Sequence, residues 1–132
     1  MTFSLFISTV LILNGMYDLL CSFSLLFFPA FVPFSTLHLS VFAQEEHREH
    51  PVVRRLLGYW LLTYGSTRLV AGLVQDDWHL NLAASLTYFI EAFCFGFEYF
   101  SGVMVASRSM FVCVTSMLMG VAVLTFDKFI DL

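Results

Sequence analysis

The fold is decided by residues 53–100, which hold two long apolar runs separated by the short polar join 75–79. The first run, Val53–Val74, reads VRRLLGYWLLTYGSTRLVAGLV, and the second, Leu80–Phe100, reads LNLAASLTYFIEAFCFGFEYF. A helix that crosses a bilayer needs about 20 apolar residues, so each run is long enough to span. Because the join is so short, we expect the two helices to form an antiparallel hairpin.

Two further apolar runs flank this hairpin, at about residues 3–28 and 104–126. Of the 132 residues, 59% are hydrophobic and 12% charged, whereas soluble domains carry about 25% charged residues. We therefore predict a single all-α transmembrane domain, an integral membrane four-helix bundle with spans at about 3–28, 53–74, 80–100 and 104–126. This leaves no room for a soluble catalytic domain or a nucleic-acid module, so we expect membrane lipid and other integral membrane proteins as partners.

The loop at residues 29–51 is the one substantial stretch between the predicted spans. Its first half carries apolar residues at Leu37, Val41 and Phe42, which suits a short interfacial helix in the headgroup plane. Its second half, residues 44–50, is charged and is predicted to be solvated.

The arginines indicate the orientation in the membrane. Arg48, Arg54, Arg55 and Arg108 lie on one side of the predicted bundle, and Lys128 lies on the other. Cytoplasmic loops carry an excess of Lys and Arg, so both termini are predicted on the non-cytoplasmic side.

Charged residues within the spans are costly and usually pair or serve function. A rise of about 1.5 Å per residue puts Arg68 and Glu91 within reach of each other across the hairpin, and we predict an intramembrane pair. The alternative is that Arg68 extends outward to Asp76 or Asp77. Asn14 and Asp18 share one helix face and are predicted in the bundle interior, where pairing is favoured over ion transport.

Small residues predict the surfaces where helices pack closely, because close backbone approach drives helix association in lipid. Gly58, Gly65 and Gly72 recur every seven residues and form one stripe. Similar notches occur on the third and fourth spans, at Ala92, Gly96, Ser116 and Gly120.

No sequence motif for a nucleophile, a zinc site or a phosphate-binding loop occurs, so we predict no catalytic site, no metal site and no cofactor. All four histidines fall in loops or at interfaces. His79 and His38 would be ligands for a pigment or haem only if the chain were an accessory subunit of an energy-converting complex.

The hairpin also carries a family resemblance. Arg55-Leu-Leu-Gly58-Tyr-Trp60, followed by Arg68, then Thr87-Tyr88 and Glu98, resembles the ergosterol biosynthetic protein 28 family over about residues 55–100. That resemblance implies a small four-span protein of the endoplasmic reticulum that acts as a non-catalytic scaffold for sterol C-4 demethylation enzymes. It implies that Arg55, Trp60, Arg68 and Glu98 are structural marks. The C-terminus departs from the family pattern because it lacks the basic tail of some members.

We therefore predict a non-catalytic scaffold or structural subunit of a membrane assembly, with a link to sterol or lipid metabolism. One alternative is an accessory subunit of a photosynthetic or respiratory complex, which would place it in an organelle inner membrane or thylakoid. A second is a small membrane enzyme or transporter that uses Asp18, Arg68 and Glu91.

Overall fold

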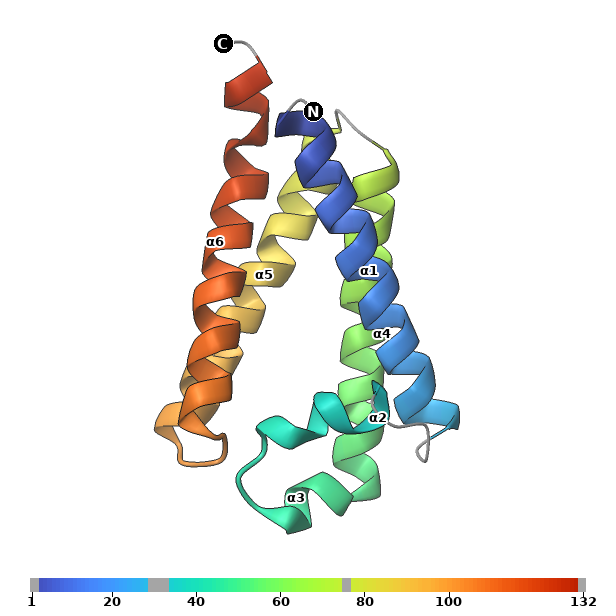
Figure 1. The fold of residues 1–132 in the computed structure, drawn as a ribbon, viewed down its shortest axis with the longest axis vertical. Coiled ribbons are helices and arrows are strands. Elements are labelled where there is room, and N and C mark those ends of the chain that lie inside the picture. The colour runs from blue at the N-terminus through green and yellow to red at the C-terminus, as the bar shows by residue number, and fades with distance from the viewer. Residues whose placement is uncertain (1–2, 29–33, 75–76, 131–132) are drawn as a thin grey trace.

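The computed structural model describes residues 3–28, 34–74 and 77–130, and four long helices make up most of that chain (Figure 1). They are α1 (Phe3–Phe27), α4 (Pro51–Leu73), α5 (Trp78–Phe100) and α6 (Ala106–Ile130). Their bounds lie within a few residues of the four predicted runs, and the predicted all-α class is confirmed.

Three of these helices are long and apolar enough to cross a membrane, over Leu5–Phe27, Trp78–Phe100 and Ala106–Thr125. Helix α4 is as long as α5 but carries Arg54, Arg55 and Arg68, which lower its hydropathy. The chain is therefore an integral membrane protein.

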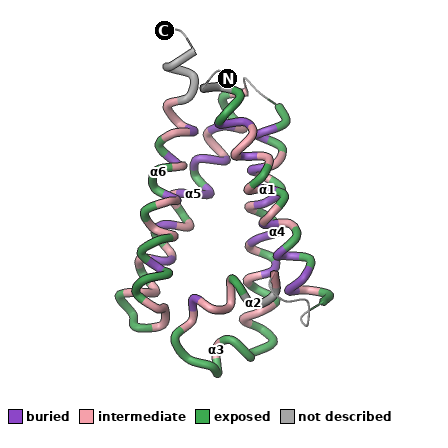
Figure 2. The backbone as a smooth tube through the Cα atoms, in the orientation of Figure 1, coloured by how far each residue is buried: buried purple, intermediate pink, exposed green. Residues whose placement is uncertain are grey.

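The four helices form two antiparallel pairs, α1 with α4 and α5 with α6 (Figure 1). The pairs lie close together where α1 begins and α6 ends, and they diverge toward the other end of the molecule. Buried positions line the facing sides of the helices, while much of their outer surface is exposed (Figure 2).

Small residues form the seam between α1 and α4 at a regular spacing. Gly15 lies against Gly65, and a Cβ atom added to Gly15 would lie 2.6 Å from the backbone nitrogen of Leu69. Seven residues away on either side, Ser8 Oγ donates to the Gly72 carbonyl and Ser22 Oγ donates to the Gly58 carbonyl, each at 2.6 Å. The predicted glycine stripe of α4 thus faces a stripe of serine and glycine on α1.

The seam between α5 and α6 is built differently. Ser85 Oγ donates to the Gly120 carbonyl at 2.7 Å, and Cys113 Sγ donates to the Ala92 carbonyl at 3.3 Å. A Cβ atom at Gly120 would meet the ring of Phe89 at 2.8 Å.

Gly96 departs from the prediction of a close-packing notch. A Cβ atom there would meet only Cys113 Sγ, at 3.7 Å, which is an ordinary contact. The expectation for Gly96 was wrong because the partner at this level is a side chain at normal van der Waals distance rather than a neighbouring backbone.

The loop after α1 forms short turns, α2 (Phe34–Leu37), η1 (Leu39–Val41) and α3 (Glu45–Glu49), in place of the predicted single interfacial helix. Val41 is buried, its carbonyl accepts from Val105 N at 2.8 Å, and Ala43 N donates to the Val103 carbonyl at 2.9 Å. These bonds tie the segment to the join between α5 and α6. The segment therefore crosses the open end between the two helix pairs (Figure 1).

Capping residues fix the starts of α4 and α5. Pro51 occupies the first turn of α4, and His50 Nδ1 accepts from Val52 N at 3.3 Å. Asp77 Oδ1 accepts from the backbone nitrogens of His79 and Leu80, which satisfies two free donors of α5.

Candidate functional site: a buried ionic cluster and its cavity

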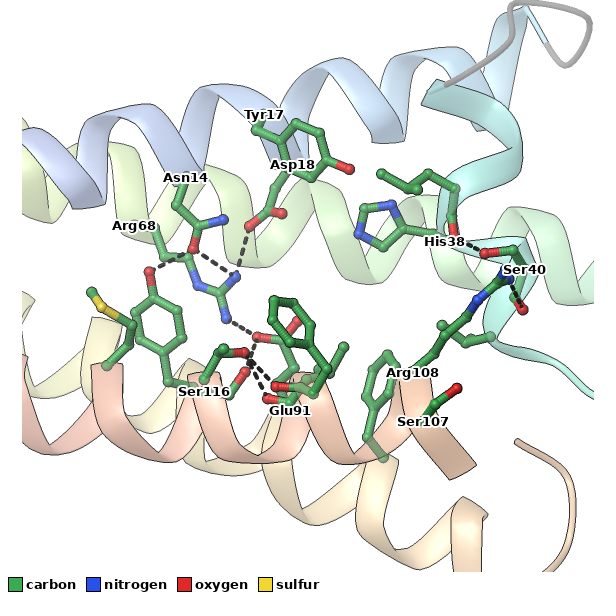
Figure 3. A pocket seen from close by; sticks show the side chains of 18 residues that line it. Asn14, Tyr17, Asp18, His38, Ser40, Arg68, Glu91, Ser107, Arg108 and Ser116 are labelled. Carbon is green, nitrogen blue, oxygen red and sulfur yellow. Dashed lines mark hydrogen bonds and ion pairs between the residues drawn. The ribbon is translucent and has the colours of Figure 1, made fainter. Parts of the chain in front are cut away.

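Arg68 is the centre of a buried ionic cluster between the two helix pairs (Figure 3). The residue is 1% exposed. Its Nη1 lies 2.7 Å from Asp18 Oδ2 on α1, and its Nη2 lies 2.5 Å from Glu91 Oε2 on α5. One guanidinium on α4 therefore joins α1 to α5, as a forked donor group can.

Uncharged side chains complete the cluster. Arg68 Nε donates to Thr87 Oγ1 at 3.0 Å, and Ser116 Oγ on α6 donates to Glu91 Oε2 at 3.1 Å. Asn14 Oδ1 accepts from Tyr88 Oη at 2.6 Å and from Arg68 Nη1 at 3.3 Å. All four long helices thus contribute to one network.

The Tyr88 ring also packs against the guanidinium. Arg68 Cζ lies 3.8 Å from the centroid of the Tyr88 ring and 5.3 Å from that of the Tyr64 ring. Such contacts stabilise a cation through the negative face of the ring. They also shield the ion pairs, and burial strengthens the electrostatic attraction.

The seam between α1 and α4 explains why Asp18 and Arg68 meet. Each lies three residues after a glycine, Gly15 or Gly65, and these two glycines are in backbone contact. Because the helices are antiparallel, Asp18 and Arg68 lie on opposite sides of the Gly15–Gly65 contact along the helix axes, within reach of each other. Arg68 and Glu91 meet because α4 and α5 are consecutive antiparallel helices.

The structure thus brings together Arg68 with Glu91, and Asn14 with Asp18, in the bundle interior. The alternative in which Arg68 reaches outward is wrong, since its guanidinium is buried and Asp77 instead caps α5. Asp76 lies outside the described residues.

A cavity of about 540 Å³ adjoins the cluster and extends toward the end where the helix pairs diverge (Figure 3). Its lining combines the cluster with apolar residues of α5 and α6 and with the loop after α1. Arg108 lies at this far end, where its Nη1 donates to the Ser40 carbonyl at 2.6 Å. The apolar lining includes Val41, Phe95, Phe111, Val112 and Met119.

The two histidines considered as ligands lie in different surroundings. His38 lines the cavity, its ring centroid lies 5.7 Å from that of Tyr17, and burial lowers the pKa of His38 to about 4. The His79 side chain is 92% exposed and lies beside Asp77. Within residues 3–28, 34–74 and 77–130, no group of three His, Cys, Asp or Glu side chains is placed to hold a metal ion.

The remaining predicted positions lie outside the cluster. Arg55 is exposed, Glu98 is half-buried, and the Trp60 ring packs edge-on against Tyr64 at 5.3 Å. Of the marks that carry the resemblance, Arg68, Thr87 and Tyr88 belong to the network. Ser116, predicted only as a packing residue, also contributes a hydrogen bond to it.

Sequence reasoning missed the partner of Asp18 and the serines of the α1–α4 seam. A signal was present, because Ser8, Gly15 and Ser22 are spaced by seven residues, as are Gly58, Gly65 and Gly72. Two matching small-residue stripes on separate apolar runs indicate that those runs pack together.

These features define a class of protein: a small, helical integral membrane protein whose intramembrane arginine is paired with carboxylates within the bundle. The chain belongs to the Erg28 like protein family, whose model matches residues 2–121. This confirms the resemblance and extends it from the hairpin to most of the chain. No curated protein and no solved structure matches the chain.

Proposed function

We propose that the protein is a non-catalytic scaffold subunit that holds other integral membrane proteins together, in an endoplasmic reticulum assembly linked to sterol or lipid metabolism. The observation that carries this proposal is membership of the Erg28 like family over residues 2–121. Exposed apolar side chains on the outer faces of the helices support it.

The proposal includes a four-span arrangement. Helix α4 lies against α1 at three levels, from Ser8–Gly72 through Gly15–Gly65 to Ser22–Gly58. If α1 crosses the bilayer, a helix paired with it over this length crosses too. The main cost of placing α4 in the bilayer is the charge of Arg68, and the buried partners of Arg68 remove that cost. Arg48, Arg54, Arg55 and Arg108 would then lie on the cytoplasmic side and both termini on the opposite side.

Of the three candidate spans, α6 offers the most free surface. Helix α6 has 22% of its span buried within the protein, compared with 39% for α1 and for α5. On α5, Phe93 and Phe97 are 71% and 60% exposed and stack on each other with ring centroids 6.3 Å apart. Aromatic side chains often dominate the binding energy at such contact surfaces.

The test is co-purification in mild detergent, with partners identified by mass spectrometry. We expect stoichiometric integral membrane enzymes of sterol or lipid metabolism to accompany the wild-type chain. The double variant Phe93→Ala, Phe97→Ala should lose them while remaining helical and monodisperse.

A matched control is available on α1, where Phe23 and Phe27 have the same spacing and are 56% and 64% exposed. The double variant Phe23→Ala, Phe27→Ala should keep the partners. A wild-type chain that purifies alone would overturn the scaffold proposal. Equal loss with both double variants would overturn the assignment of the docking surface to α5–α6.

A further inference from the structure

The cavity beside the ionic cluster is too small for a partner helix and large enough for one small amphiphile. A helix about 10 Å across rises 5.4 Å per turn, so a single turn occupies about 420 Å³. The cavity of about 540 Å³ would hold little more than one turn. It falls instead in the range of about 300–1,000 Å³ that is typical of small-molecule sites.

The cavity is polar at both ends and apolar between them. Along α6, the lining residues run from Ser107 to Met119, a rise of about 18 Å. Arg108 lies near one end and Ser116, in the cluster, lies toward the other. Phe111 and Val112 come between them, and Phe95 lines the cavity from α5. An elongated ligand with an apolar body fits this pattern.

The charges of the lining favour an uncharged ligand. At the cluster end, the two carboxylates of Asp18 and Glu91 face the single cation of Arg68, which disfavours an anionic group there; over the whole lining, Arg108 at the far end brings the formal charges into balance. His38 adds no charge at neutral pH because its pKa is about 4. A charged ligand would leave an unpaired charge within the membrane, which is costly.

The cluster also presents hydrogen-bond acceptors to the cavity. The two side-chain hydrogen bonds that Glu91 accepts, from Arg68 and Ser116, use Oε2, and the ion pair of Asp18 uses Oδ2. Among the described residues, no group donates a hydrogen bond to Glu91 Oε1 or Asp18 Oδ1, and both residues line the cavity. A ligand hydroxyl would donate to one of these oxygens.

We propose that this cavity binds one molecule of an uncharged membrane lipid that carries a hydroxyl group. The hydroxyl donates to the free carboxylate oxygen of Glu91 or Asp18. The apolar body lies along Phe95, Phe111 and Val112 toward the Arg108 end. This site is separate from the outer surface of α5–α6 proposed for partner docking, and it does not depend on the scaffold function.

The first test uses the purified full chain and its co-purifying lipids, extracted and identified by mass spectrometry. We expect enrichment of an uncharged hydroxyl lipid over the bulk membrane composition. Val112→Trp fills the cavity without altering the ionic cluster and should remove this enrichment. Val114→Trp, on the exposed side of the same helix, is the matched control and should keep it.

The second test compares diazirine photoprobes on the wild-type chain: a long-chain alcohol, the matching carboxylic acid and the matching hydrocarbon. A hydrogen bond to a charged acceptor corresponds to about a tenfold gain in affinity, so the alcohol should label cavity residues about tenfold more than the others. Unlabelled alcohol should compete. This comparison needs no variant and holds even if Val112→Trp does not fold.

Two results would overturn the proposal. One is equal labelling of Phe95, which is 7% exposed, and Val112 by alcohol and hydrocarbon, which would indicate ordinary lipid contact. The other is preferential labelling by the acid, or enrichment of an anionic lipid, which would indicate an anion site at Arg108. Neither result bears on co-purification of partner proteins, so failure here and failure of the scaffold proposal remain distinguishable.

Discussion

The two helix pairs are held together in different ways. In α1–α4, backbone meets backbone, since a Cβ atom at Gly15 would lie 2.6 Å from Leu69 N and one at Gly65 would lie 2.9 Å from the Gly15 carbonyl oxygen. In α5–α6, the close contact at Gly120 is with the Phe89 ring, and Gly96 has room for a side chain. The first pair is closely packed, and the second is a looser hairpin whose α6 is less buried than α1 or α5.

This difference has a physical basis in lipid. Apolar side chains gain little by leaving lipid for a helix interface, so association depends on close packing and on polar contacts. The α1–α4 pair uses close packing along the whole seam. The α5–α6 pair depends more on single hydrogen bonds, such as Ser109 Oγ to the Phe95 carbonyl at 2.7 Å. Arg68 connects the two pairs.

The largest expected effect comes from removing the group that connects the pairs. Arg68→Met leaves Asp18 and Glu91 buried without their cation, which typically costs about 3–5 kcal/mol. We expect this loss in the free energy of unfolding, measured by circular dichroism during denaturation in detergent micelles. Arg55→Met, at an exposed arginine outside the cluster, is the control and should change stability by less than about 1 kcal/mol. An Arg68→Met chain as stable as wild type would contradict a structural role for the cluster.

A second prediction compares the two seams directly through glycine. Gly15→Ala forces a methyl group against the α4 backbone and should cost about 1–3 kcal/mol, the usual cost of overpacking. The methyl group of Gly96→Ala would make only an ordinary van der Waals contact with Cys113 Sγ. This change should be neutral or stabilising by up to about 1 kcal/mol, because alanine favours the helix. Both are read from the same unfolding assay. Equal destabilisation by the two variants would show that the seams do not differ.

A third and more local effect concerns the segment that closes the open end between the pairs. Burial lowers the pKa of His38 from 6.5 to about 4. His38 therefore binds a proton more readily when the segment is detached from the join between α5 and α6 than when it is packed there. The contact of this segment with the join between α5 and α6 is therefore most stable above pH 6.5. Its free energy weakens as the pH falls toward 4, by at most about 1.4 kcal/mol per pH unit.

Hydrogen exchange measures this docking at the amides of Ala43 and Val105, which bond across to Val103 and Val41. Their protection, corrected for intrinsic exchange, should decrease between pH 7 and pH 5. His38→Phe should abolish the decrease, and His79→Phe, at an exposed position, should preserve it. A pH dependence that survives His38→Phe would assign it to another group.

Much of the fold could be predicted from the sequence, because the four helices are long apolar runs and the hairpin places Arg68 near Glu91. The pairing of α1 with α4 was harder, since their contacts join positions about 36–64 residues apart across a loop of irregular turns. The glycine stripe of α4 showed that some helix would pack there, and the matching spacing of Ser8, Gly15 and Ser22 identifies α1.

The cavity and the docked segment could not be predicted. Val41 looked like one apolar residue of an interfacial helix, but the structure ties it to a distant join, where its carbonyl accepts from Val105 N and the neighbouring Ala43 N donates to the Val103 carbonyl. The divergence of the two pairs depends on contacts between distant parts of the chain. Neither feature has a periodic signal in the sequence.

The most direct test of the account uses a photo-cross-linking amino acid placed in the native membrane at two matched sites. Leu118 on α6 is 66% exposed and Leu13 on α1 is 62% exposed. The first belongs to the α5–α6 pair and the second to the α1–α4 pair. We predict a specific adduct with an integral membrane protein from position 118 and none from position 13. Equal adducts from both positions, or none from position 118, would contradict the claim that the looser pair is the docking half of the molecule.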